Sequence, residues 1–300
     1  MNIKRILNKI ARSSSWYKEV VFQDCEKFWN LKEFNLDLVN LGSNSAKNAF
    51  NYRGLNINAA NWAMGPQSLQ LDLNILQTYY SYLKPSATVL ITLCPFSCLV
   101  GYDYSYWGDK YYTILHHSQI PCYNIQKRIQ MYDIKQNPYK YIPFISALKI
   151  FKDIICPGKK ESHMTKQQME RDVSRFLDSW KKQFFIKDFD KELSLLNKHS
   201  YRESQCILSQ LVDFSKRYGF KPVIVLPPVS PYLRRYFSES MIERYINNYI
   251  YGAVGQETMF LNYFDSEEFT DFNLYKNSYF LNLQGAKLFT NRVLNDLNIL

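Results

Sequence analysis

The sequence predicts an α/β fold in which a parallel sheet is covered by helices on both faces. Two observations lead to this fold class. Four short, uninterrupted apolar runs end at glycine, proline or a polar turn, and segments with helical spacing separate them. Strands buried on both faces consist of such continuous apolar runs, and strands that alternate with helices pair in parallel.

The first half of the pattern begins with a strand over 37–42, because this apolar run ends in glycine and small polar residues. A helix is expected over 66–83, where leucines repeat every three or four residues. Pro66 lies in its first turn, a position that does not require a backbone N–H. A second strand, 88–94, ends at Pro95.

The second half of the pattern repeats the alternation. We expect a helix over 200–218, then a strand over 222–226 that two prolines terminate. A helix over 238–252 and a strand over 259–263 follow. An amphipathic helix over 284–297 completes the fold.

We divide the chain into an N-terminal helical segment, 1–33, and an α/β domain, 34–300. The alternation is lost between about 99 and 199, a stretch rich in tyrosine, lysine and phenylalanine. Because 99–199 follows the second strand directly, we interpret it as a largely helical insertion. It would cap the carboxyl ends of the strands, outside which ligands bind in open α/β sheets.

The composition excludes several classes of protein. No run approaches the roughly 18 uncharged apolar residues of a membrane span. The six cysteines form no CxxC pair, so we expect free thiols in a reducing compartment and a cytoplasmic location. No zinc-type Cys/His spacing, P-loop or dinucleotide-binding motif is present, so we expect no metal and no cofactor. We interpret the acidic residues between 265 and 271 as a solvated loop.

The first twelve residues are basic. The net charge of the chain is +10, and Lys4, Arg5, Lys9 and Arg12 occur here without an acid. Isoleucines and a leucine fall on the opposite helical face, so this segment is either a capping helix or a peripheral contact of 1–12 with the inner face of a membrane. We do not expect a nucleic-acid partner, because no nucleic-acid-binding motif accompanies the charge.

Polar residues follow the predicted strands where a ligand site is expected. Gly42-Ser43-Asn44-Ser45 follows the first strand, and Cys94 ends the second. A block rich in asparagine and aromatic residues, 275–286, leads into the final helix.

These segments resemble the SGNH/GDSL hydrolases, in particular the carbohydrate acylesterase and acyltransferase-like branch linked to bacterial surface polysaccharides. Gly42-Ser43-Asn44 stands where the family has Gly-Asp/Ser-Ser with the nucleophile third, and the segment 61–69 is similar to the branch's Asn-hydrophobic-small segment that leads to a Gln and a helix. The family block Phe-x-Asp-x-x-His-Leu-Asn-x-x-Gly-Ala matches 275–286 in spacing. The resemblance implies an SGNH-hydrolase or flavodoxin-like three-layer fold and a role with acylated carbohydrate.

Three departures from the family pattern affect the predicted chemistry. Asn44, Asn277 and Phe280 stand at the Ser, Asp and His positions of the triad. Ester hydrolysis by this scheme needs an attacking hydroxyl, an imidazole that takes its proton and a carboxylate that orients the imidazole. The family's Gly-x-Asn-Asp block is also missing after the second strand. We therefore expect a degenerate triad in a protein that binds or acts on acylated carbohydrate.

An active site built from other residues is the alternative. Ser45 or Ser43 would be the nucleophile of an ester hydrolase or O-acyltransferase, and a relocated base such as His116 or His117 would come from the cap. Cys94 is a less favoured thiol nucleophile.

Neutral amides and aromatic rings also suit sugar hydroxyls and the CH faces of sugar rings. The alternative role of such amides is to brace loops. The residues assigned to binding are Asn44, Asn61, Gln67, Asn277, Phe280 and Asn282, with further rings at Tyr275 and Tyr279.

Overall fold

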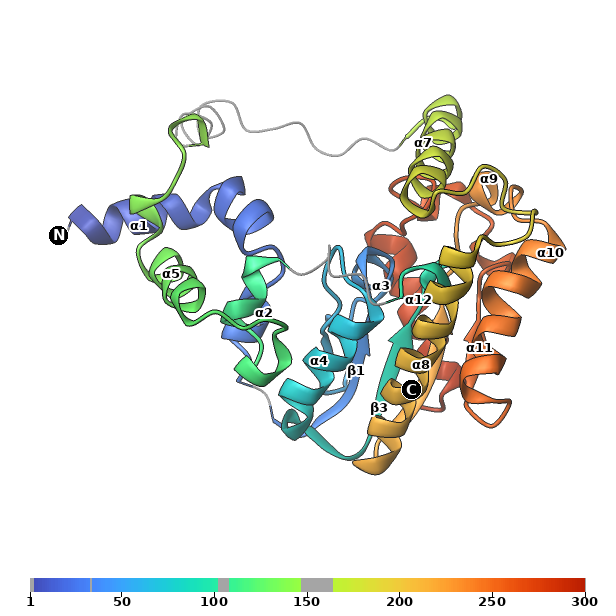
Figure 1. The fold of residues 1–300 in the computed structure, drawn as a ribbon, viewed down its shortest axis with the longest axis horizontal. Helices are drawn as coiled ribbons and strands as arrows, with labels where there is room; N and C mark the ends of the chain where they lie inside the picture. Colours follow the sequence, from blue (N-terminus) through green and yellow to red (C-terminus); the bar gives the residue numbers. More distant parts are fainter. Residues whose placement is uncertain (1–2, 33, 102–107, 147–163, 300) are drawn as a thin grey trace. The chain divides into compact units, whose positions relative to one another are not determined.

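The computed structural model describes residues 3–32, 34–101, 108–146 and 164–299 of the chain (Figure 1). It shows an α/β protein with a parallel sheet flanked by helices, which confirms the predicted fold class. Within the expected insertion, 102–107 and 147–163 lie outside the described residues, as do residues 1–2 of the basic segment.

The chain forms two compact units. The larger unit comprises 33–104 and 163–300, and the smaller unit comprises 1–32 and 105–162. The stretch 99–199 is thus divided between the two units, and the N-terminal segment belongs with the middle of the chain.

The larger unit is built on a sheet in the order β2-β1-β3-β4-β5, and every pairing is parallel. Residues of successive strands are in register, for example Val39 with Val89 and Ile91 with Ile224. The strands are β1 (Leu36–Leu41), β2 (Ala59–Asn61), β3 (Leu83–Thr92), β4 (Lys221–Leu226) and β5 (Phe260–Asn262).

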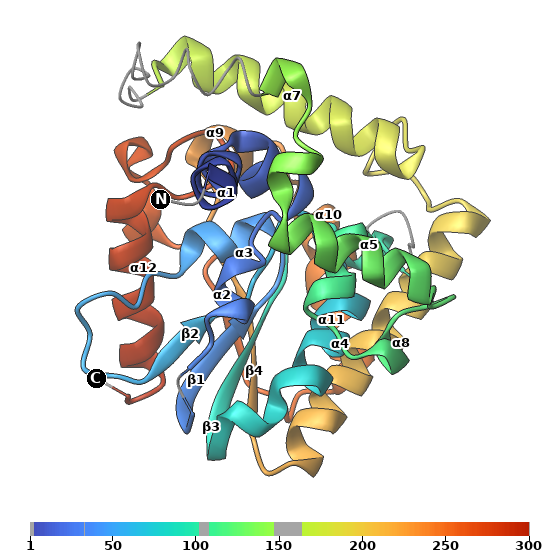
Figure 2. The same cartoon turned by 90° about the vertical axis from the view of Figure 1, so that its left-hand side faces the viewer.

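Helices cover both faces of this sheet. Figure 2 shows α12 on one side of the strands and α4, α8 and α11 on the other. The longer helices of this unit are α4 (Leu69–Tyr79), α7 (Lys166–Phe184), α8 (Leu195–Arg217) and α12 (Leu283–Asp296), and the shorter ones are α3 (Asn44–Ala49), α9 (Pro231–Arg234), α10 (Glu239–Ile242) and α11 (Asn248–Val254).

The hydrophobic core lies between the sheet and these helices. The inner strand residues Leu38, Leu90 and Val225 are fully buried, and Phe289 of α12 packs against the same cluster. Burial of this kind is the main source of stability, at about 25 cal/mol per Å² of apolar surface. The strands are apolar on both faces because helices cover both.

The smaller unit is helical. Its N-terminal part contains α1 (Ile3–Ser13), the π-helical turn η1 (Trp16–Val21) and α2 (Glu26–Trp29). Helix α1 packs against the 3₁₀ turn η7 (Pro138–Lys140), and η7 and η5 (Asp109–Thr113) pack against α5 (Ile125–Gln136). Cys25 and Tyr111 are fully buried in its core. The Trp29 indole N–H lies 3.3 Å from the backbone oxygen of Thr113, which ties the first segment to the second.

Several elements differ from the sequence-based expectation. The helix expected over 66–83 spans 69–79 (α4), so Pro66 precedes it, and the strand expected over 88–94 begins at Leu83 (β3). The sequence does not predict the edge strand β2, because Ala59-Ala60-Asn61 contains no β-branched or aromatic residue. The helix expected over 238–252 is interrupted by a π-helical turn, η8 (Glu243–Asn247), between α10 and α11. None of the helices in the described residues is long and apolar enough to cross a bilayer.

Candidate functional site

The sheet order places the candidate site at the carboxyl ends of β1 and β3. The chain winds from β1 outward to β2 and then returns to β3 on the other side of β1. Ligands of doubly wound sheets bind at such a switch point, where the loops after the two central strands diverge. The segments 42–45 and 93–97 begin there.

The turn after β1 requires a glycine and contains a buried acid. Gly42 has φ +129°, and a Cβ there would lie 2.5 Å from the Thr92 carbonyl oxygen. The Gly42 N–H donates to Asp72 Oδ1 at 2.8 Å, and the Gln67 amide donates to the same oxygen. Burial raises the pKa of Asp72 to about 7, although both hydrogen bonds oppose the shift. This network fixes the turn.

The residues at the start of α3 are held by the backbone of the neighbouring loop. Ser43 Oγ accepts the Gln67 N–H at 3.1 Å. The Asn44 side chain lies against Gly65, where a Cβ would come within 1.8 Å of Asn44 Oδ1. Residue 44, which aligns with the nucleophile in the family that the sequence resembles, is therefore an amide packed against the main chain.

Ser45 lies at a very small cavity. It is 9 % exposed, and the cavity, lined also by Pro95, Pro227 and Tyr279, has a volume of about 10 Å³. That volume suits a single water molecule rather than a sugar or an acyl chain. Burial raises the pKa of Tyr279 well above its usual value; Cys94 adds to the shift and a hydrogen bond with Ser45 opposes it. The structure thus brings Ser45, Cys94 and Tyr279 together.

The C-terminal block is held by its own side chains. Asn277 Oδ1 accepts the backbone N–H groups of Tyr279 and Phe280 at 3.0 and 2.7 Å, which makes an Asx turn. Asn282 caps α12 by accepting the N–H groups of Gln284 and Gly285, each at 3.0 Å. Both amides have local structural roles.

Phe280, at the expected histidine position, belongs to an aromatic cluster. Its ring lies edge-on to Phe176 with centroids 5.8 Å apart, and the Lys276 ammonium lies 5.4 Å from its centroid. Lys276 also donates to Asn48 Oδ1 at 2.7 Å. This bond brings the C-terminal block next to α3.

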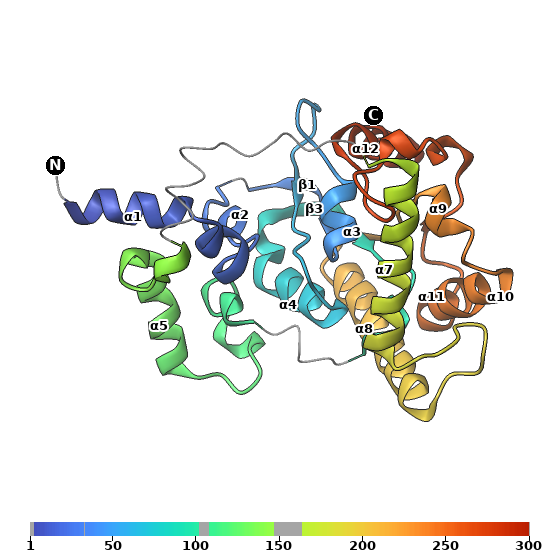
Figure 3. The ribbon, with the colours of Figure 1, turned by 90° about the horizontal axis from the view of Figure 1, so that it is seen from above.

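Helix α7 packs on this end of the sheet (Figure 3). Its Trp180 contacts Phe96, which follows β3, and also Tyr279, with centroid distances of 5.1 and 5.3 Å. The buried Asp172 accepts the Ser278 N–H at 3.0 Å and its hydroxyl at 2.7 Å. The carboxyl ends of the strands are therefore covered by a helix that makes both aromatic and polar contacts. We call this covered region, formed by 93–97 and 275–282 under α7, the closed edge.

The other predicted binding amides also have internal partners. Asn61 Nδ2 donates to the carbonyl oxygens of Lys47 and Phe50 at 3.2 and 3.1 Å. Gln67 donates to Asp72, as described above. These amides brace loops in the structure.

The predicted bases lie elsewhere in the chain. His116 and His117 are exposed residues of the smaller unit, and His116 Nδ1 lies 2.8 Å from Ser118 Oγ. In the described part of the larger unit the one histidine is His199, which pairs with Glu203 on α8 at 3.1 Å. Pairing of Ser45 or Ser43 with His116 or His117 stays a prediction.

Sequence reasoning did not identify the roles of Asp72 and Asp172. Asp72 had a visible signal: it is one of very few charged residues between 34 and 100, and it lies within a run of leucines. Asp172 had only its spacing to Arg175, with which it forms an ion pair at 2.6 Å; its other partner, Ser278, is 106 residues away.

No protein-family model and no curated protein matches this chain.

Proposed function

We propose that the larger unit is an SGNH/GDSL-like domain that no longer hydrolyses esters and that binds acylated carbohydrate, such as that of bacterial surface polysaccharides. One observation supports the loss of hydrolysis above the others. Asn44, Asn277 and Phe280 occupy the three triad positions, and each is engaged in packing or in a local turn. Neither amide attacks an ester, and a phenyl ring accepts no proton.

The arrangement of these three positions supports the SGNH-like assignment. Residue 44 begins the helix after β1, and residues 277–280 precede the last helix. Ser45 and Tyr279 line the same small cavity, so the two segments meet at the switch point.

The proposed carbohydrate ligand would bind on the outside of the closed edge. Phe176 and Trp180 of α7 and Phe280 are half-buried, so each residue keeps some exposed surface. Aromatic faces of this kind suit the CH faces of sugar rings. The cavity beside Ser45 is too small to admit an acyl group.

Labelling with a fluorophosphonate probe tests the loss of hydrolysis. We expect no adduct on the native protein by intact mass, and a serine adduct in the triple variant Asn44→Ser, Asn277→Asp, Phe280→His. The control is the same triple variant with Asn44→Ala instead of Asn44→Ser. An adduct on native Ser45 or Ser43 would contradict the proposal and would show an active ester hydrolase or acyltransferase.

Titration calorimetry with an O-acetylated polysaccharide and its deacetylated form tests the ligand class. We expect the acetylated form to bind more tightly and Phe176→Ala to weaken that binding. Tyr251→Ala removes a partly exposed ring of α11 and serves as the control. Equal binding of the native protein and the Phe176→Ala variant would contradict this location.

We propose further that the protein is cytoplasmic and that α1 contacts an anionic membrane face. Ile3 and Leu7 are 71 % and 42 % exposed, next to the exposed Lys4 and Arg5. Such a helix lies flat on a lipid surface. The fraction of protein that sediments with anionic liposomes should fall in the double variant Ile3→Ser/Leu7→Ser. An unchanged fraction would contradict the membrane contact.

A further inference from the structure

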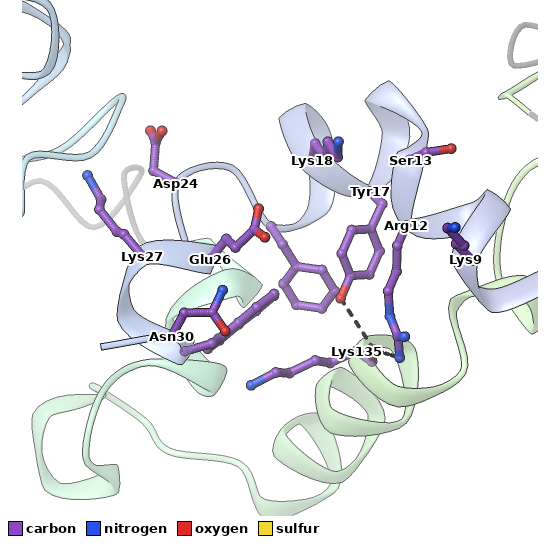
Figure 4. Close-up of a pocket in the computed structure, with 12 residues that line it drawn as sticks. Lys9, Arg12, Ser13, Tyr17, Lys18, Asp24, Glu26, Lys27, Asn30 and Lys135 are labelled. Atoms are coloured by element: carbon purple, nitrogen blue, oxygen red, sulfur yellow. Dashed lines mark hydrogen bonds between the residues drawn. The ribbon is translucent and has the colours of Figure 1, made fainter. Parts of the chain in front are cut away.

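The smaller unit contains a pocket that no part of the proposed function uses. Its volume is about 810 Å³, and its lining comes from α1, η1, α2 and the end of α5 (Figure 4). Pockets for small molecules and cofactors have volumes of about 300–1,000 Å³. The pocket is therefore large enough for a ligand of nucleotide size.

The lining of this pocket is basic. Five basic side chains and two acidic ones line it, a net charge of +3. The basic residues are Lys9, Arg12, Lys18, Lys27 and Lys135, and the acidic ones are Asp24 and Glu26. Such an excess favours an anionic ligand over a neutral or cationic one.

One of these cations is held in place by the fold. Arg12 Nη2 donates to the carbonyl oxygens of Lys135 and Gln136 at 3.3 and 3.0 Å. The Tyr17 hydroxyl donates to the same Lys135 oxygen at 3.3 Å, and Figure 4 shows both side chains converging there. Because the guanidinium has five N–H donors, others are left to bind a phosphate.

Aromatic rings form the apolar part of the lining. Phe22 packs edge-on against Tyr17 and Trp29, with centroids 4.9 and 5.0 Å apart. The Lys135 ammonium lies 4.1 Å from the Trp29 ring centroid, and burial lowers the pKa of Lys135. An anion near Lys135 would thus lie beside an aromatic surface.

We propose that this pocket binds an organic phosphate, that is, a phosphate ester whose organic part contains a ring. The phosphate would lie near the cations of α1 and η1, and the ring would pack near Trp29. Asp24, Glu26 and Asn30 lie on the segment around α2 and would accept or donate hydrogen bonds to ligand hydroxyls. Inorganic phosphate would leave most of the volume unfilled.

Titration calorimetry of the full chain with four probes tests the ligand class: ATP, glucose 1-phosphate, adenosine and inorganic phosphate. We expect at least one of the two organic phosphates to bind about tenfold more tightly than adenosine and inorganic phosphate. Tighter binding of ATP would assign the organic part to a nucleoside, and tighter binding of glucose 1-phosphate would assign it to a sugar. Failure of both organic phosphates to exceed inorganic phosphate would overturn the proposal.

Variants then locate the binding. The double variant Lys9→Ala/Lys18→Ala should bind the organic phosphate about tenfold or more weakly than the native protein, because two cations near the phosphate are lost. Arg5→Ala is the matched control, since Arg5 is an exposed base of the same helix that does not line the pocket. Circular dichroism checks that the variants fold. Equal affinities of the native protein and the folded double variant would overturn the location.

Discussion

The carboxyl edge of the sheet and the pocket of the smaller unit differ in how their polar side chains are used. At the sheet edge, where the fold favours a ligand site, the amides of Asn277 and Asn282 bond to nearby backbone N–H groups. In the pocket, Lys9 and Lys18 are exposed around a cavity of about 810 Å³. Side chains that already have protein partners stabilise the fold, whereas exposed ones around a cavity can bind a ligand.

This comparison makes opposite predictions for substitutions in the two regions. Substitutions of packed side chains at the closed edge should lower the free energy of unfolding, whereas substitutions of exposed side chains in the pocket should change ligand affinity alone. Asp72 is the exception, because its burial disfavours the charged form.

The largest effect on the free energy of unfolding is expected at Phe96, in the centre of the aromatic cluster of the closed edge. Phe96 is 1 % exposed and packs on Trp180 and Phe189. Phe96→Ala should lower the free energy of unfolding by about 4 kcal/mol, because it leaves a cavity in a packed site. Urea unfolding measures this change. Phe185→Ala, at an 82 % exposed ring, is the control, and an equal effect of the two variants would contradict a sealed edge.

A smaller effect, dependent on pH, is expected at Asp72. Burial raises its pKa from 3.8 to about 7, so the folded protein binds this proton more tightly than the unfolded chain does. The contribution of Asp72 is therefore fully present below about pH 4 and is lost as the pH rises to about 7. Asp72→Asn removes this dependence. The variant should gain stability relative to the native protein as the pH rises above 4, by about 3 kcal/mol at pH 6.

Asp37 provides a control, because its contribution to stability depends on pH in the opposite direction to that of Asp72. The hydrogen bond from Lys84 holds the pKa of Asp37 below its usual value. Its contribution is therefore present above about pH 4 and is lost in more acidic solution. Urea unfolding of Asp37→Asn should show a loss of stability near neutral pH that disappears in acid. The same pH trend for both variants would show that Asp72 is ionised in the folded protein throughout.

The sequence predicted the sheet better than it predicted the site. Strands β1, β3 and β4 each contain a largely apolar run that helices bury on both faces, so this run and the turn residues after it predict the strand. The packing partner of a segment is not encoded in its periodicity. The sequence pattern predicts one insertion over 99–199, whereas α7 belongs to the larger unit and α5 to the smaller one.

The roles of individual side chains were harder to predict. Asn277 has the spacing of a triad residue, but its Asx turn is visible only once the backbone conformation is known. The pocket depends on Lys135, whose carbonyl oxygen accepts a hydrogen bond from Arg12 across 123 residues of sequence. Pairs that are so far apart in the chain leave no pattern in the local sequence.

The contacts that hold α7 on the edge are expected to contribute less than Phe96. Asp172→Asn should lower the free energy of unfolding by about 2 kcal/mol, since it weakens two hydrogen bonds to Ser278 and removes the ion pair with Arg175. Hydrogen exchange of α7 should become faster. Asp178→Asn, at an exposed position of the same helix, is the control. Unchanged exchange in α7 would show that its aromatic contacts alone close the edge.

The cap of α12 should have a smaller effect again. Asn282→Ala removes the acceptor of two backbone N–H groups, and a lost cap of this kind costs about 1 kcal/mol. Asn282→Asp keeps the acceptor and should retain most of the stability in thermal unfolding. A native-like Asn282→Ala variant would contradict a structural role and would return Asn282 to the candidates for ligand binding.

The smallest effect on stability distinguishes the two regions most sharply. Lys9→Ala and Lys18→Ala should each change the free energy of unfolding by no more than about 0.5 kcal/mol, as is usual for surface positions. Both residues are exposed, so alanine leaves no buried group without a partner. Thermal unfolding without ligand measures this. A loss as large as that of Asn282→Ala would mean that the lysines support the fold, and the contrast between a closed edge and an available pocket would fail.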